Sequence, residues 1–95
     1  MNKYEITFIV KSDMEEAEIK KTAEAMKKVL TDKNAKILEE KVMGQRELAY
    51  EINKMKTGYY FLYVVETTSE VIDEFERVAR INENILRHLT IKVED

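Results

Sequence analysis

Residues 59–66, Tyr-Tyr-Phe-Leu-Tyr-Val-Val-Glu, have the strongest β-strand preference in the chain, because aromatic and β-branched side chains fit a pleated, half-buried surface. Residues 4–10, Tyr-Glu-Ile-Thr-Phe-Ile-Val, predict a second strand, since large apolar side chains recur at every second position. The residues of this alternating face are Tyr4, Ile6, Phe8 and Val10. Ile9 on the opposite face indicates a central strand. These two segments predict the centre of a β-sheet.

A helix is predicted directly after the strand of residues 4–10. Ser12, followed three residues later by Glu15, fits a capping box at the helix start. Apolar residues then recur at helical spacing as far as about Thr31. Asn34 is suited to the left-handed conformation that ends many helices.

A strand is predicted over residues 35–43, and Gly44 indicates a bulge or bend before the strand resumes in residues 48–52. We expect residues 55–58, Met-Lys-Thr-Gly, to form a hairpin turn that leads into the strand of residues 59–66.

The remaining residues predict one more helix and one more strand. Residues 67–69, Thr-Thr-Ser, offer caps for a helix that ends at residues 82–84, Asn-Glu-Asn. Residues 85–93 predict the last strand, but its register stays open because Leu86 and Leu89 have opposite parity.

The order βαββαβ predicts an α+β fold of the ferredoxin-like split βαβ type. Right-handed crossovers then give a four-stranded antiparallel sheet with both helices on one face. The first and third strands occupy its centre and the other two its edges. No Pro-rich or Gly-rich linker interrupts the chain, so we expect a single domain over residues 1–95.

Two helices on one side leave the other face of the sheet open. If Phe61 points towards the helices, then Tyr60, Leu62 and Val64 point away from them, beside Thr7 and Ile9. An open face this apolar is typical of a surface that binds a partner. The alternative is that long side chains from neighbouring strands cover it.

Composition excludes several kinds of function. The longest apolar run is seven residues, Tyr59 to Val65, far short of the roughly 20 that span a membrane, and no signal-peptide pattern begins the chain. The chain has no cysteine, which excludes disulfides and thiolate metal sites. His88 is the only histidine and lacks partners for a metal site or proton relay. With no phosphate-binding glycine loop or nucleophile motif, the sequence predicts no catalytic residues, no cofactor, no metal and no small-molecule substrate.

Net charge argues against tight RNA binding by this chain alone. There are 16 basic and 19 acidic residues, which gives −3, whereas nucleic-acid affinity comes largely from neutralised phosphates. The objection holds unless basic residues cluster. A modest local surplus occurs between Lys41 and Lys56, where Arg46 and Lys54 also lie.

One RNA-binding alternative is the RNA-recognition motif, which shares this order of elements. Its third-strand octapeptide is partly imitated by residues 58–63, Gly-Tyr-Tyr-Phe-Leu-Tyr. However, Thr57 replaces the basic residue before the glycine, and Tyr60 occupies a small position. Thr7 and Ile9 also offer no aromatic ring for base stacking, so this alternative ranks low.

Residues 44–52, Gly-Gln-Arg-Glu-Leu-Ala-Tyr-Glu-Ile, fit a pattern of Gly, any residue, a basic residue, a polar residue, Leu, a small residue, Tyr, any residue and Ile or Val. Together with residues 3–6, Lys-Tyr-Glu-Ile, and Gly58-Tyr59-Tyr60, this stretch resembles the family of bacterial ribosomal small-subunit protein six. The resemblance extends over the whole chain. It departs from the family at Asn2, Glu47 and Glu51, where a basic residue, a second basic residue and proline are common.

The resemblance implies a structural, non-catalytic, cytoplasmic ribosomal protein. Such a protein binds the central domain of small-subunit ribosomal RNA cooperatively with small-subunit protein eighteen, a small basic protein. On this basis we expect RNA contacts from Lys3, Arg46, Lys54, Lys56, Arg87 and His88. We expect partner contacts from Tyr50, Tyr60, Leu62 and Val64. The alternative function is a protein-interaction or ligand-regulatory domain of the same fold that does not bind RNA.

Overall fold

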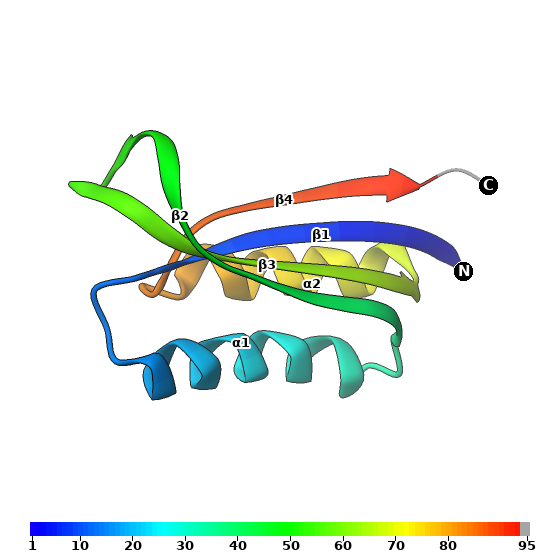
Figure 1. Ribbon diagram of the computed structural model, residues 1–95. Coiled ribbons are helices and arrows are strands. Elements are labelled where there is room, and N and C mark those ends of the chain that lie inside the picture. The colour runs from blue at the N-terminus through cyan, green and yellow to red at the C-terminus, as the bar shows by residue number, and fades with distance from the viewer. Residues whose placement is uncertain (94–95) are drawn as a thin grey trace.

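The computed structural model describes residues 1–93 and has the predicted order of elements. Figure 1 shows two layers, with the sheet on one side and both helices on the other. The elements are β1 (Asn2–Lys11), α1 (Glu16–Thr31), β2 (Lys36–Ile52), β3 (Met55–Thr67), α2 (Ser69–Ile81) and β4 (Ile85–Val93).

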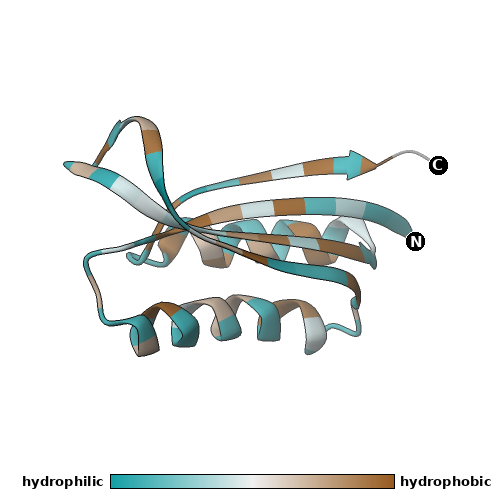
Figure 2. Ribbon diagram, viewed as in Figure 1, coloured by the Kyte–Doolittle hydropathy of each residue, from teal (hydrophilic) through white to brown (hydrophobic). Residues whose placement is uncertain are grey.

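The sheet order is β2-β3-β1-β4 and all neighbouring strands are antiparallel. The prediction that the first and third strands are central is therefore confirmed. Phe8 stacks on Phe61 with ring centroids 5.2 Å apart, and Phe75 of α2 approaches Phe8 edge-on. Figure 2 shows hydrophobic residues concentrated on the central strands and alternating with polar ones along both helices. The core thus lies between the helices and one face of the sheet.

The predicted capping box at Ser12 is wrong. Helix α1 begins at Glu16, and the extended residue before it, Glu15, makes no capping hydrogen bond. The Ser12 hydroxyl instead lies 2.7 Å from the Thr57 hydroxyl, 45 residues along the chain. A contact in the tertiary structure has therefore replaced the local one. Asn34 does adopt the predicted left-handed conformation, with φ of 63°.

The predicted position of the hairpin turn is also wrong. The turn lies at Asn53 and Lys54, whose φ angles are 49° and 67°, and β3 already begins at Met55. Two consecutive residues with positive φ match the right-handed twist of the flanking strands. The bulge at Gly44 is confirmed, because the register shifts between Val42 and Gly44 and Gly44 has a φ of +86°.

The register of β4 explains the conflicting parity of its leucines. Ile9 pairs with Arg87, but Val10 pairs with Ile85. Leu86 is therefore the extra residue of a β-bulge. Beyond it, the strand alternates regularly, with Leu89 opposite Thr7.

Candidate functional site

Residues 45–57 form an arm that extends beyond the rest of the sheet. Figure 1 shows this β2–β3 arm rising from the sheet on the side away from the helices. Its bend begins at Gly44, where a positive φ favours glycine although nothing lies within 4 Å of a Cβ built there. Conformation, not space, therefore requires this glycine.

Basic residues of the arm gather on the side that continues the open face. Arg46 pairs with Gly58, so Arg46 lies on the same side as Lys56 and Tyr60. Glu47 pairs with Thr57 and lies on the opposite side. Lys54 is exposed at the turn. Two of the three basic residues of the arm, Arg46 and Lys56, thus lie on one side of it, and Lys54 lies at its turn.

Within residues 1–93, the ion pairs engage Lys20, Lys27, Lys41 and Arg77. None of the six basic residues predicted to bind RNA takes part in these pairs. Three of the four ion pairs involve a helix residue, and four acidic residues lie on α2 alone. On that helix, the Arg77 guanidinium holds the pKa of the Glu74 carboxyl below its usual range. Helix α2 therefore carries an excess of acidic residues, four against Arg77 and Arg80, whereas α1 does not.

Arg87 of β4 and Tyr50 of the arm are in contact, although they come from opposite edge strands. The Arg87 guanidinium donates a hydrogen bond to the Tyr50 hydroxyl. Its central carbon also lies 5.7 Å from the centroid of the Tyr50 ring, within the range of a cation–π interaction. The predicted RNA-binding residue and the predicted partner-binding residue thus form one intramolecular pair.

The open face carries the predicted apolar residues. Tyr60, Leu62 and Val64 pair with Ile9, Thr7 and Glu5, and all three are half-buried. They lie on the side opposite Phe61 and Tyr63, which are buried under the helices. The alternation predicted for this strand is therefore confirmed.

Two apolar residues of the open face were not predicted. Leu89 and Ile91 lie opposite Thr7 and Glu5, and are 56% and 51% exposed. The bulge at Leu86 obscured them, although the alternation of residues 87, 89 and 91 would have identified them once the register was known. A shallow pocket of about 220 Å³ beside them is bordered by Thr7, Ile9, Tyr60, Arg87, His88 and Leu89.

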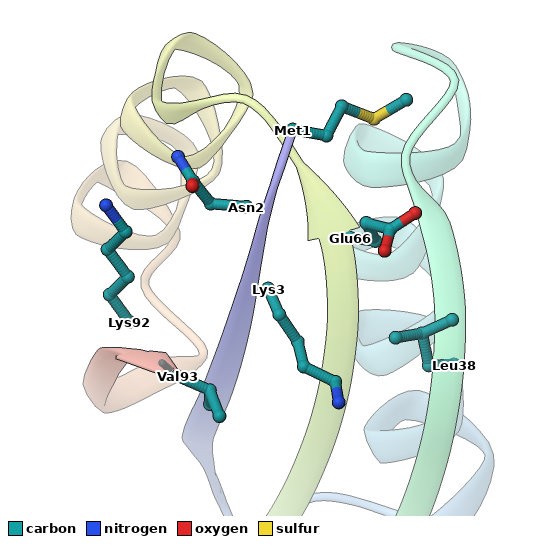
Figure 3. A pocket seen from close by; sticks show the side chains of 7 residues that line it. All are labelled: Met1, Asn2, Lys3, Leu38, Glu66, Lys92 and Val93. Carbon is teal, nitrogen blue, oxygen red and sulfur yellow. The ribbon is translucent and has the colours of Figure 1, made fainter. Parts of the chain in front are cut away.

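Lys3 lies apart from the arm. It lines a different pocket, of about 400 Å³, at the other end of the sheet, together with Glu66 and Lys92 (Figure 3). Ile9 lies six positions after Lys3 in β1, which corresponds to about 20 Å along a strand.

His88 lies next to Arg87 in the chain but does not share its side of the sheet. It pairs with Phe8, whereas Arg87 pairs with Ile9. Its side chain is therefore directed towards the helix side, although the residue borders the pocket of the open face. The six basic residues do not form one cluster: Arg46, Lys54, Lys56 and Arg87 lie on or beside the arm, whereas Lys3 and His88 do not.

Residues 1–93 contain no group of three or more His, Cys, Asp or Glu side chains placed to hold a metal ion. None of the helices in that range is long and apolar enough to span a membrane.

Comparisons with known proteins agree on one family. The family model described as ribosomal protein S6 matches residues 3–92. The crystal structure of 30S ribosomal protein S6 from Thermotoga maritima is similar to this chain with a TM-score of 0.92 and 29% sequence identity. The match covers 97% of this chain and 87% of the Thermotoga chain.

Proposed function

Because the chain belongs to the ribosomal protein S6 family, we propose that it binds the central domain of small-subunit ribosomal RNA cooperatively with small-subunit protein eighteen, with residues 1–95 acting as one domain. Members of this family are structural, non-enzymatic constituents of the small subunit of the cytoplasmic ribosome. The proposal adds the mode of binding to that family assignment. The observation that carries it is the basic arm beside an apolar open face.

The arm supports the RNA contact. Arg46, Lys54 and Lys56 are exposed, and basic side chains on an extended hairpin can reach phosphates without bringing the acidic helix α2 near the RNA. Arg46 has the further advantage that guanidinium groups bind phosphate oxygens in a bidentate manner. We place the main phosphate contacts on this arm.

The open face supports the protein contact. Tyr60, Leu62 and Val64, extended by Leu89 and Ile91, form an apolar strip that the helices do not cover. Exposed apolar surface of this kind is typical of a protein-binding site. We place protein eighteen on this strip, with Tyr50 at its border.

The adjacency of the two surfaces supports cooperative binding. A protein with a net charge of −3 gains little from phosphate neutralisation on its own. A basic partner on the open face would add positive charge next to the arm, so that each of the two proteins favours RNA binding by the other. We expect a coupling free energy of about 1–3 kcal/mol, typical of linked binding sites.

The decisive experiment measures binding of central-domain ribosomal RNA to this chain, with and without protein eighteen, over a series of salt concentrations. The expected result is weak binding by the chain alone and about 5- to 150-fold tighter binding with the partner. Tight binding that the partner does not change would refute cooperativity. Binding to the partner without any RNA binding would favour the protein-interaction alternative.

Arg46→Ala tests the arm directly. Removing one phosphate contact should weaken the RNA complex and lower the slope of log affinity against log salt by about one unit. Arg80→Ala is the matched control, because Arg80 is an exposed arginine in the last turn of α2. An equal effect of both substitutions would show that only net charge matters and that the arm is not the contact.

A further inference from the structure

The contact between Tyr50 and Arg87 joins the two edges of the sheet. In the order β2-β3-β1-β4, the edge strands are separated by two central strands, which corresponds to about 14 Å in a flat sheet. Because side chains stand roughly perpendicular to a sheet, two at that separation meet most readily when one edge folds over the open face. The arm makes this fold, and the contact holds its free side to β4.

The backbone of β2 around Tyr50 is not regularly paired with β3. Register with β3 runs to Glu47 opposite Thr57 and resumes at Ile52 opposite Met55. Residues 48–51 therefore face a single residue, Lys56, on the partner strand. A strand segment with this surplus lacks the regular ladder that fixes the rest of β2.

Side-chain contacts hold residues 48–51 where regular backbone pairing with β3 is missing. Leu48 approaches Gly58 closely, because a Cβ built on Gly58 would lie 3.3 Å from Leu48 Cδ2. Two residues further along the arm, Tyr50 holds Arg87 through both its hydroxyl and its ring. Leu48 thus packs the base of the segment, and Tyr50 attaches its middle to β4.

On the basis of the RNA-binding function above, we propose that the Tyr50–Arg87 contact is a strap that positions the arm for RNA. The strap restrains residues 48–51, and with them the orientation of Arg46 and Lys54 on either side. Arg87 then acts through the arm as a positioning residue, and its phosphate contact is secondary. Without the strap, only a fraction of molecules would hold the arm in the binding conformation, and the apparent affinity would fall by that fraction.

Two substitutions break the strap while keeping the charge of the protein. Tyr50→Leu removes the hydroxyl and the ring face, and Arg87→Lys removes the planar guanidinium but retains the positive charge. Each should lower the NMR order parameters of residues 48–51 towards the flexible range, below about 0.6. Each should weaken RNA binding by about twofold to fivefold, as expected for an exposed cation–π contact, with an unchanged salt slope. Arg80→Lys on α2 is the matched control and should change neither quantity.

The double variant Tyr50→Leu/Arg87→Lys should lose no more affinity than either single variant, because both remove one interaction. Unchanged order parameters in the single variants would overturn the strap. Lowered order parameters with unchanged RNA affinity would overturn its positioning role. A loss confined to Arg87→Lys would make Arg87 a direct RNA contact and would also overturn it. If the unmodified protein binds no RNA even with its partner, the proposed function fails, and the order parameters still decide whether the strap exists.

Discussion

Replacing Gly58 by alanine should destabilise the protein, and the structure provides the magnitude. A Cβ built on Gly58 would lie 2.3 Å from Ile9 Cγ2 and 3.3 Å from Leu48 Cδ2. The first distance is far inside van der Waals contact. Ile9 is 6% exposed in a central strand, and its β-branched side chain has little freedom to rotate away. The strands must therefore separate locally to admit the methyl group.

Overpacking of this kind typically costs about 1–3 kcal/mol. An alanine in a strand recovers about 0.5–1 kcal/mol, because glycine loses more conformational entropy on folding. We therefore expect a net loss of about 1–2 kcal/mol in the free energy of unfolding, or a fall in Tm of about 4–15 °C for a domain of this size. Urea denaturation and calorimetry would measure both quantities.

The control removes the atom that the new methyl group would meet. Ile9→Leu keeps the side-chain volume but has no Cγ2, and such an exchange usually costs less than about 1.5 kcal/mol. In that background, Gly58→Ala should cost less than about 0.5 kcal/mol, which gives a coupling of about 1 kcal/mol between the two positions. An equal cost in both backgrounds, or no cost in either, would refute the steric explanation.

Leu62→Asp should leave a folded monomer but abolish binding of the protein partner, because an unpaired carboxylate is costly to bury in an interface. Phe61→Asp, at a position 3% exposed, should instead unfold the chain. Circular dichroism measures folding of both variants, and a pull-down measures partner binding. Lys3→Ala should weaken the RNA complex less than Lys56→Ala, although both remove one charge, because Lys3 lies at the other end of the sheet; a larger effect of Lys3→Ala would move the RNA site to that end. Burial raises the pKa of Tyr63 above its usual 10.0, so the protein should keep full stability below about pH 10 and lose it as pH rises further. Tyr63→Phe should remove that alkaline loss in a Tm–pH series, and a slope that persists would assign it to other groups.

The central strands could be predicted because burial imposes a period of two on both. Tyr4, Ile6 and Phe8 alternate without interruption and pair with Val65, Tyr63 and Phe61, which alternate in the same phase. A shift by one residue would turn every one of these side chains away from the helices. Long-range pairing and local pattern therefore agree here, and the predicted face is confirmed.

The position of the hairpin turn could not be predicted from the residue types. The turn contains a lysine, Lys54, and the nearby glycine, Gly58, has a different role. Lysine is uncommon at positive φ, yet Lys54 adopts it at 67° because the arm must reverse there. Gly58 attracts a turn assignment in the sequence, but it lies inside β3 and serves the close approach of Ile9. Whether a glycine supplies a turn or a space depends on residues far away in the chain, and a single sequence does not show them together.

The residues of the predicted site do not all lie together in the structure, because their positions also depend on long-range strand pairing. Residue type and charge identified the basic arm, because Arg46, Lys54 and Lys56 lie within one hairpin. The expected RNA contacts also included His88, which the register of β4 directs to the other side from Arg87. The Tyr50–Arg87 pair requires three events that no local pattern encodes: the bend at Gly44, the fold of the arm over the open face and the bulge at Leu86. The first two bring the arm to β4, and the third sets which β4 side chains face it. The composition of the site follows from the sequence, and its geometry follows from where the strands lose their regular register.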